Sequence, residues 1–218
     1  MTVSLHDQRP HLQAIQPIWH VDGPAEPRTP QDILAFLGAL IDTHAAADKA
    51  PAVPDDVALA HRDERHQTVR NAARLTDHSA ETDLELLVRD ALGAFRFGDA
   101  PGITINGPTV FLRPAMVGLV ALALHELSIN SIKFGMLGDA GRNSTLAIRW
   151  HCCDDGLFFT WRERGVPILR LATADTSGFG SAFLTTVLPE RFGIETSLAI
   201  LPGGIRYLAH LRDYTLRY

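Results

Sequence analysis

A carboxylate, a carboxamide and an amine lie on one face of an apolar segment near the middle of the 218-residue chain. Glu126, Asn130 and Lys133 are four and three residues apart, so they project on the same side of an α-helix with about 3.6 residues per turn. Gly135 follows them and is expected to end the helix. A metal-binding amide between an acid and a cation suits Mg²⁺ and phosphate oxygens, whereas the alternative is a solvated helix face with ordinary charges.

A glycine-rich turn is the second segment with the residue types for chemistry. It is Ser177-Gly178-Phe179-Gly180-Ser181, and it precedes an apolar, helix-like run. Backbone N–H groups at such a helix start attract anions, and glycine lets the backbone approach a phosphate closely. The turn therefore fits a phosphate group, and the alternative is an ordinary glycine turn in front of a helix.

A tryptophan and a glutamate form the third pair. Trp161 and Glu163 lie two residues apart on an expected strand, so both side chains point to the same side of the sheet. An indole beside a carboxylate could bind a purine base. The alternative, which the pair taken alone favours, is a core tryptophan next to a solvated glutamate.

In this order, the three segments resemble the ATP-binding domain of HWE-class sensor histidine kinases, which belong to the wider GHKL group of ATPases. The motifs are His-Glu-x-x-x-Asn-x-x-Lys-x-Gly from His125, Trp-x-Glu-x-Gly from Trp161 and Gly-Phe-Gly-Ser from Gly178. The resemblance extends from about Asp83 to Arg212. Three motifs in register are far more specific than any one of them.

The resemblance implies ATP and Mg²⁺ as cofactors. Asn130 matches the N-box asparagine that binds Mg²⁺, and Glu126 matches the acid one turn earlier that orients a water or assists proton transfer. Lys133 would face phosphate oxygens. His125 is one of the letters that name the class, and we interpret it as a packed, hydrogen-bonded histidine, with a catalytic role as the alternative.

The resemblance also assigns the adenine and phosphate sides of the nucleotide. Glu163 and Gly165 match the G1 box, whose acidic side chain accepts a hydrogen bond from the adenine amino group, with Trp161 beside it. The G2 box and its surroundings, next to the phosphates and a lid over residues 166–177, comprise Gly178, Phe179, Gly180 and Ser181. Val166 stands where similar sequences often have a second glycine, and its β-branched side chain resists positive φ, so the adenine loop is expected to differ.

The composition limits the remaining function classes. A net charge of −5 and a sequence pI near 6.0 argue against a nucleic-acid binder. The longest apolar run, from about Met116 to Leu124, is shorter than the roughly 20 residues that span a membrane, and the N-terminus lacks the pattern of a secretory signal. We therefore expect a cytoplasmic protein without membrane contact. Cys152 and Cys153 are adjacent on an expected strand and point to opposite faces, so neither a disulfide nor a zinc site is expected.

The elements that position these residues predict an α+β fold. It is a two-layer α/β sandwich of the GHKL type preceded by an antiparallel helical hairpin. Residues 1–27 are expected to be an N-terminal arm or linker, residues 28–78 a dimerisation and phosphotransfer-like hairpin, and residues 79–218 the ATP-binding catalytic domain. Helices are expected over residues 30–50, 55–75, 83–95, 114–135 and 181–192. Asn106-Gly107, Asp154-Asp155-Gly156 and Pro202-Gly203-Gly204 each predict a strand hairpin.

The helical hairpin predicts a homodimer, because alone it would leave an apolar seam exposed, whereas two copies form a four-helix bundle. It also lacks the expected phosphoacceptor. Aligning Leu34-Ala35 with the pattern of the family puts Arg28 where the acceptor histidine should be. His61 and His44 are weak candidates that fit solvated helix residues better, so the acceptor stays unassigned.

The leading hypothesis is an ATP-dependent protein-histidine kinase core of two-component signalling, without a fused sensor domain or an obvious acceptor histidine. Its signal would arrive through a separate sensor protein, and its expected partner is the receiver domain of a response regulator. The alternative is a non-catalytic dimeric adaptor or pseudokinase, or a histidine phosphotransfer protein that binds a response regulator.

Overall fold

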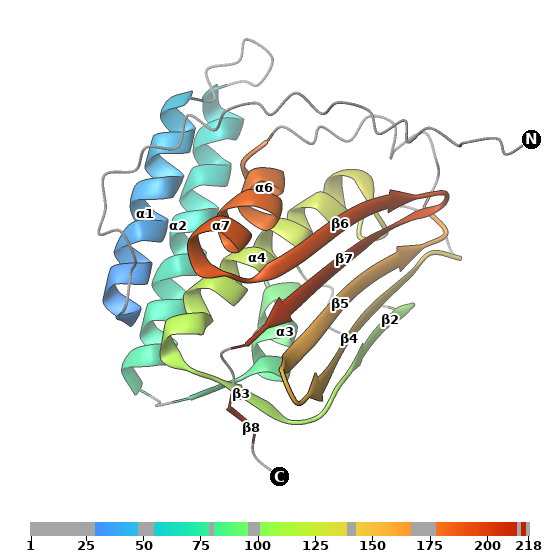
Figure 1. The fold of residues 1–218 in the computed structure, drawn as a ribbon. Helices are drawn as coiled ribbons and strands as arrows, with labels where there is room; N and C mark the ends of the chain where they lie inside the picture. The colour runs from blue at the N-terminus through green and yellow to red at the C-terminus, as the bar shows by residue number, and fades with distance from the viewer. Residues whose placement is uncertain are drawn as a thin grey trace, which may run out of the picture.

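The computed structural model describes residues 29–47, 55–78, 81–95, 101–138, 143–166, 178–212 and 215–216. They form a layer of helices packed on one face of a five-stranded sheet, with helices α1 and α2 on the side of α4 away from the sheet (Figure 1). The expected arm, residues 1–27, and residues 167–177 of the expected lid lie outside the described residues. The predicted α+β sandwich behind a helical hairpin is confirmed.

The main sheet has the strand order β2-β4-β5-β7-β6. Its strands are β2 (Ile103–Asn106), β4 (Thr145–Cys153), β5 (Gly156–Arg164), β6 (Glu195–Leu201) and β7 (Gly204–Leu211). Strand β2 is parallel to β4 and the other pairs are antiparallel, so the β4–β5 and β6–β7 hairpins are as predicted. A small second sheet contains β1 (Thr82–Asp83), β3 (Val110–Leu112) and β8 (Thr215–Leu216).

The hairpin predicted at Asn106-Gly107 is wrong. β2 pairs with β4, and β3 pairs with β1 and β8, so the two segments belong to different sheets. Gly107 packs directly on the ring of Trp150, where a Cβ would clash, and the Trp150 Nε1–H donates to the carbonyl of Pro108 at 2.7 Å. This glycine therefore permits close packing of the chain on an indole, a role that the short-range turn signal does not reveal.

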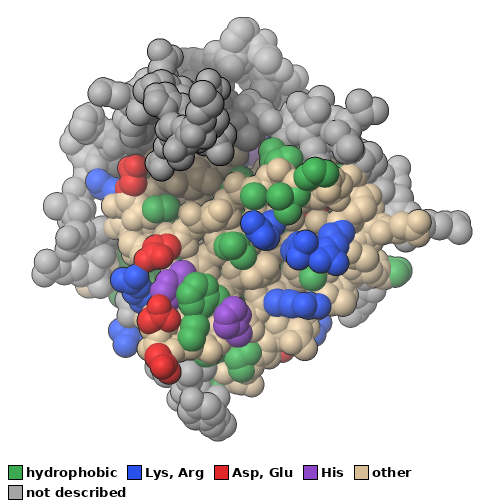
Figure 2. All heavy atoms as spheres, turned by 45° about the vertical axis from the view of Figure 1, so that its right-hand side comes forward, with side chains coloured by type: hydrophobic (Ala, Val, Ile, Leu, Met, Phe, Trp, Pro, Cys, Tyr) green, Lys and Arg blue, Asp and Glu red, His purple; other side chains and the backbone are tan. Residues whose placement is uncertain are grey.

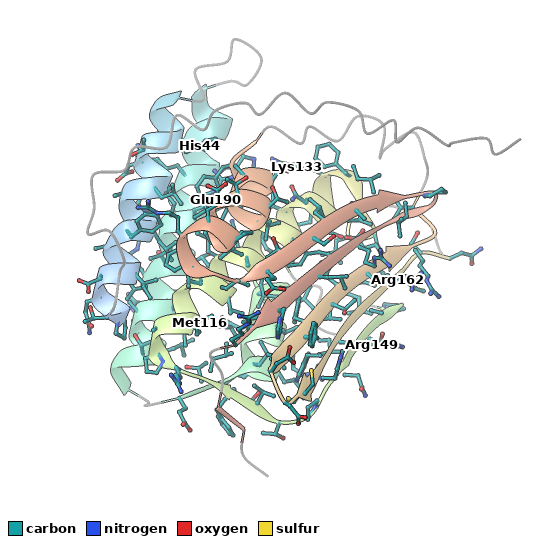
Figure 3. All side chains as sticks on the ribbon, viewed as in Figure 1. His44, Met116, Lys133, Arg149, Arg162 and Glu190 are labelled. Carbon is teal, nitrogen blue, oxygen red and sulfur yellow. The ribbon has the colours of Figure 1, made fainter. Side chains whose placement is uncertain are left out.

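The two faces of the main sheet differ in polarity. On β5 the side chains alternate, and Leu157, Phe159 and Trp161 face the helices while the intervening residues point outward. Figure 2 shows that the outward face carries lysine or arginine, histidine and acidic side chains with hydrophobic side chains between them. Arg149 and Arg162 extend from this face of β4 and β5 (Figure 3). The helices therefore all lie on the face that buries the core.

Helix α4 (Pro114–Phe134) is the centre of the helical layer and carries the N-box residues. Pro114 opens it at a position where the missing N–H costs no helical hydrogen bond, and the N–H of Gly135 closes it on the carbonyl of Ser131. Within the described part of the chain, α4 is the one helix long and apolar enough to cross a membrane. It is instead mostly buried, because it lies between the α1–α2 hairpin and the sheet.

The other helices are α1 (Pro30–Ala47), α2 (Asp55–His78), α3 (Leu84–Gly93), α6 (Phe179–Ala182) and α7 (Leu188–Phe192), with a π-helical turn over Phe183–Val187. The run expected as one helix over residues 181–192 is thus interrupted. Pro189 lacks an N–H, and the N–H of Leu188 donates five residues back to the carbonyl of Phe183, which gives the π turn.

The apolar seam of α1 is covered within the chain. Leu37, Leu40 and Ile41 are at most 2% exposed and share one continuous core with α4 and the sheet. The ring of Phe36 meets that of Phe192 of α7 edge to face, with centroids 5.6 Å apart. The argument from an exposed seam to a dimer is therefore wrong. The homodimer and the division of the chain at residue 78 stay predictions.

Candidate functional site

The N-box residues of α4 have graded exposure. Glu126 is 1% exposed, Asn130 is half-buried, and Lys133 is exposed near the C-terminal end of the helix (Figure 3). Among the described residues, the carboxamide of Asn130 has no hydrogen-bond partner. Partial burial, together with the nearby charge of Arg65, lowers the pKa of Lys133. The amide and the amine thus remain open to a ligand, while the carboxylate is closed in.

Glu126 is closed in by an arginine of α2. Arg65 donates from Nε to Oε1 at 2.7 Å and from Nη2 to Oε2 at 3.2 Å. Its guanidinium also lies over the ring of Phe179, with Cζ 4.3 Å from the ring centroid. One side chain of the helical hairpin therefore contacts both the N-box acid, Glu126, and the G2 turn (residues 178–181).

The G2 turn packs directly on the N-box. A Cβ built on Gly180 would lie 2.5 Å from Oε2 of Glu126, whereas one built on Gly178 meets nothing within 4 Å. Phe179 is 4% exposed, and its ring also meets that of His44 edge to face. The two segments, about 50 residues apart in the sequence, are brought together as the resemblance requires, and Gly180 is the residue whose small size permits it.

Glu163 is buried at the end of α4. Its Oε1 accepts a hydrogen bond from Trp161 Nε1 at 2.9 Å and its Oε2 accepts one from the backbone N–H of Met136 at 2.6 Å. Burial raises the pKa of Glu163, and these hydrogen bonds act in the opposite direction. Gly135 permits the approach, because a Cβ there would clash with Oε2. The N-box and the G1 strand are thereby joined.

Of the alternative predicted for the Trp-x-Glu pair, a core tryptophan next to a solvated glutamate, the structure supports the first half and contradicts the second. Trp161 is 1% exposed in the core and supports the carboxylate through its N–H, so it is a core tryptophan. Glu163 is 3% exposed, so the alternative of a solvated glutamate is wrong. Both oxygens of Glu163 accept hydrogen bonds within the chain, and a carboxylate, with about four acceptor positions, can accept a further one when a donor reaches it.

The loop after Glu163 turns at Gly165. This glycine has φ of 75°, and a Cβ on it would lie 2.8 Å from the carbonyl oxygen of Asn143. The side chain of Val166 is buried against Ile205, and its N–H donates to the carbonyl of Gly203. The valine that departs from the family pattern thus serves as an apolar anchor of the loop on the β6–β7 turn.

The three histidines singled out in the sequence, His125, His44 and His61, are buried or half-buried. His125 is 7% exposed, its Nδ1 lies 3.4 Å from Oγ1 of Thr68, and its ring meets that of Phe95. Burial lowers the pKa of His125. His44 is buried against Phe179, so its expected solvation is wrong, and His61 is half-buried with Nδ1 3.4 Å from Oε2 of Glu64.

Sequence reasoning missed Arg65 and Met136. Arg65 lies in the run Arg62-Asp63-Glu64-Arg65-His66, where charges of both signs hide the one that turns inward. Met136 acts through its backbone N–H, which no side-chain pattern can reveal. The close packing of Gly135 could have been suspected from the glycine that ends the N-box motif.

Two curated proteins are similar to this chain in sequence. No protein-family model matches the chain. Over 145 residues, or 62% of the chain, it is 33% identical to blue-light-activated histidine kinase 1 of Erythrobacter litoralis. The chain is therefore similar in sequence to a histidine kinase over this segment. A second relative, the blue-light-activated histidine kinase of Brucella anthropi, is 24% identical over 128 residues, or 57% of the chain.

The chain spans only part of the length of these relatives, 37% of the first and 25% of the second. Its fold matches the structure of the blue-light-activated histidine kinase EL346 of Erythrobacter litoralis with a TM-score of 0.59, at 15% identity, over 87% of this chain and 62% of that one. The histidine kinase domain of EL346 matches with a TM-score of 0.54, at 14% identity, over 87% of this chain and 88% of that one. The fold is therefore that of the GHKL-type histidine kinases.

Proposed function

We propose that this protein is the ATP-dependent core of a protein-histidine kinase in two-component signal transduction. The observation that carries the proposal is the meeting of three motifs in a histidine kinase fold. Gly180 packs on Glu126, and Glu163 accepts from the N–H that follows Gly135, so the G2 box, the N-box and the G1 strand adjoin one another. These are the segments that the resemblance assigns to phosphate, Mg²⁺ and adenine.

The residues around α4 fit Mg²⁺ and phosphate. The half-buried carboxamide of Asn130 has no partner among the described residues, and one such oxygen suffices because Mg²⁺ in proteins usually keeps several waters and binds phosphate oxygens. When bound, the ion would neutralise phosphate charge. The exposed ammonium of Lys133 supplies a second positive charge, and Gly180 brings the start of α6 next to Glu126 of the same helix.

Glu163 would select the base, and Glu126 would assist proton transfer or orient a water. The carboxylate of Glu163 is fixed by Trp161 and by the N–H of Met136 and is 3% exposed, so an adenine amino group would reach it after a neighbouring segment moves. Transfer of the γ-phosphoryl group asks mainly for positioning and charge neutralisation, which these groups can provide without a covalent intermediate on the catalytic domain.

The acceptor and the partners complete the proposal. The phosphoryl group goes to a histidine that is not assigned, on this chain or on a separate protein, and from there to the receiver domain of a response regulator. Use of ATP as the donor places the reaction in the cytoplasm. A homodimer through the α1–α2 hairpin would need surface other than the buried seam of α1, for example the neighbourhood of the exposed Leu59 on α2.

The test is incubation of the purified protein with γ-labelled ATP and Mg²⁺. The proposal predicts label that is labile to acid and stable to alkali, lost in Asn130→Ala and kept in Asn106→Ala, which removes an exposed amide on β2. Absence of label together with absence of nucleotide binding would contradict the proposal. Nucleotide binding without label would restrict it to transfer onto another protein or leave the adaptor hypothesis.

A further inference from the structure

The contact of Arg65 with the N-box acid uses the whole carboxylate. The guanidinium donates to both oxygens of Glu126, at 2.7 and 3.2 Å, and the arginine side chain is 16% exposed. Such a two-point fork is the strongest form of arginine–carboxylate pairing and fixes geometry as well as charge. The acid that would assist proton transfer therefore has both oxygens engaged by a side chain of α2.

The G2 turn covers the Glu126–Arg65 pair from the other side. Gly180 lies against Oε2, and Phe179 lies under the guanidinium, so the G2 turn closes the other side of the pair. With Glu126 at 1% exposure, a water or a hydroxyl group reaches the carboxylate only if Arg65 or the G2 turn moves. In this arrangement the site is assembled but its acid is occupied.

The packing of α2 on α1 and α4 holds Arg65 next to Glu126. Other contacts hold α2 in the same place: His66 Nε2 lies 2.9 Å from Oδ1 of Asp42 on α1, and Thr68 meets His125 on α4. Val69 and Ala72 bury the same face of α2 in the core. Because Arg65 is part of this rigid helix, any movement of the hairpin away from α4 withdraws the guanidinium from Glu126.

We propose that Arg65 is an inhibitory clamp, a positioning residue that holds Glu126 and Phe179 in an inactive arrangement until the hairpin moves. The inference rests on the proposed kinase function. It adds a route by which a signal reaches the site: a partner that displaces α2 frees the acid and the G2 turn together. Arg65 acts through Glu126 and need not contact the nucleotide.

The test compares Arg65→Met with Arg70→Met, a matched arginine on the exposed side of α2. Release of a proton-transfer group is expected to raise kcat for ATP turnover in Arg65→Met by about tenfold, at the low end of what such groups contribute. The KM for ATP should change less than kcat, since Arg65 forms its hydrogen bonds with the acid and meets the G2 box at the ring of Phe179. Arg70→Met should behave as wild type.

Two further variants separate release from general loosening. Arg65→Lys keeps a cation but cannot form the fork, so it should show an intermediate gain and serves if Arg65→Met fails to fold. In a Glu126→Gln background, Arg65→Met should give no gain. Unchanged or lower kcat in both Arg65 variants, or an equal gain without Glu126, would overturn the clamp.

Binding of a fluorescent ATP analogue by the wild-type protein distinguishes this failure from failure of the kinase proposal. Wild type that binds nucleotide, with Arg65 variants that gain nothing, overturns the clamp alone. Wild type and Arg65 variants that all fail to bind nucleotide overturn the proposed function and the clamp with it.

Discussion

Gly180 lies so close to Glu126 that a Cβ on the glycine would be 2.5 Å from Oε2. This contact joins the G2 turn to the N-box helix. Arg65 contacts both segments, because it pairs with Glu126 and lies over the ring of Phe179. Neither the Glu126 side chain nor the G2 turn has free space to move into, because Glu126 is 1% exposed and Phe179, next to Gly180, is 4% exposed. The size of residue 180 therefore controls how the two motifs meet.

Gly180→Ala should destabilise the protein, since the added methyl group must push the carboxylate or the turn aside. We expect a loss of about 1–3 kcal/mol in the free energy of unfolding, as for other overpacked sites, and weaker nucleotide binding. Urea denaturation measures the first effect. Gly178→Ala is the control, because a Cβ there meets nothing within 4 Å, and equal losses in both variants would contradict the packing argument.

Trp161→Phe should cost more than Trp150→Phe. Both substitutions remove an indole N–H from a buried ring, but the first leaves the charged carboxylate of Glu163 short of a donor, while the second affects the neutral carbonyl of Pro108. Hydrogen bonds to charged groups are worth about 1.5–3 kcal/mol, against about 0.5–1.5 for neutral ones. Chemical denaturation of the two variants at the same pH gives the comparison, and the reverse order would refute it.

Leu37→Ala should reduce the stability of the whole described fold. Leu37 is fully buried in the core shared by the hairpin, α4 and the sheet, so the cavity should cost about 2–5 kcal/mol, and unfolding should remain a single transition. Leu59→Ala, at a residue 50% exposed on α2, should change stability by less than about 0.5 kcal/mol. Two separate transitions in the wild type would show that the hairpin is an independent unit.

His125 should make stability depend on pH in a defined direction. Burial lowers the pKa of His125, so the folded state excludes a proton that the unfolded chain takes up below about pH 6.5. Its contribution is therefore complete above that pH and is lost as the pH falls toward the folded-state pKa, by at most about 1.4 kcal/mol per pH unit.

Substitution of His125 by Gln removes that titration. Between about pH 7.5 and about pH 5.5, wild type should lose more unfolding free energy than His125→Gln, as followed by urea denaturation at each pH. His151→Gln, at an exposed site on β4, is the control and should lose as much as wild type. Equal losses in wild type and His125→Gln would contradict a neutral buried histidine.

The sequence could predict the parts of the fold that rest on local signals. The strand hairpins at Asp154-Asp155-Gly156 and Pro202-Gly203-Gly204 follow from turn residues between alternating apolar strands, and Pro114 and Gly135 bound α4 as expected. Asn106-Gly107 shows the limit. The same local signal occurs there, but packing on Trp150 and pairing of β2 with β4 decide the structure, and both partners are distant in the sequence.

Long-range packing also explains two features that the sequence does not predict, the cover of the α1 seam and the contact of Arg65 with Glu126. The periodicity of α1 predicts its apolar face but not which surface covers it, so it suggests a partner copy, whereas α4 of the same chain covers the seam. Spacing places Glu126 and Asn130 on one face of α4, but it cannot show that a charge from α2 turns inward to Glu126. Such contacts depend on the docking of one element on another.

The central claim is that the face of α4 bearing Asn130 binds Mg²⁺-ATP, and titration calorimetry tests it most directly. Wild type and Asn106→Ala should bind ATP in the presence of Mg²⁺ and bind it more weakly when a chelator removes the ion. Asn130→Ala should lose about tenfold or more in affinity, equivalent to about 1.4 kcal/mol, and should no longer respond to Mg²⁺. No binding by wild type, or Mg²⁺-dependent binding that survives in Asn130→Ala, would contradict the account.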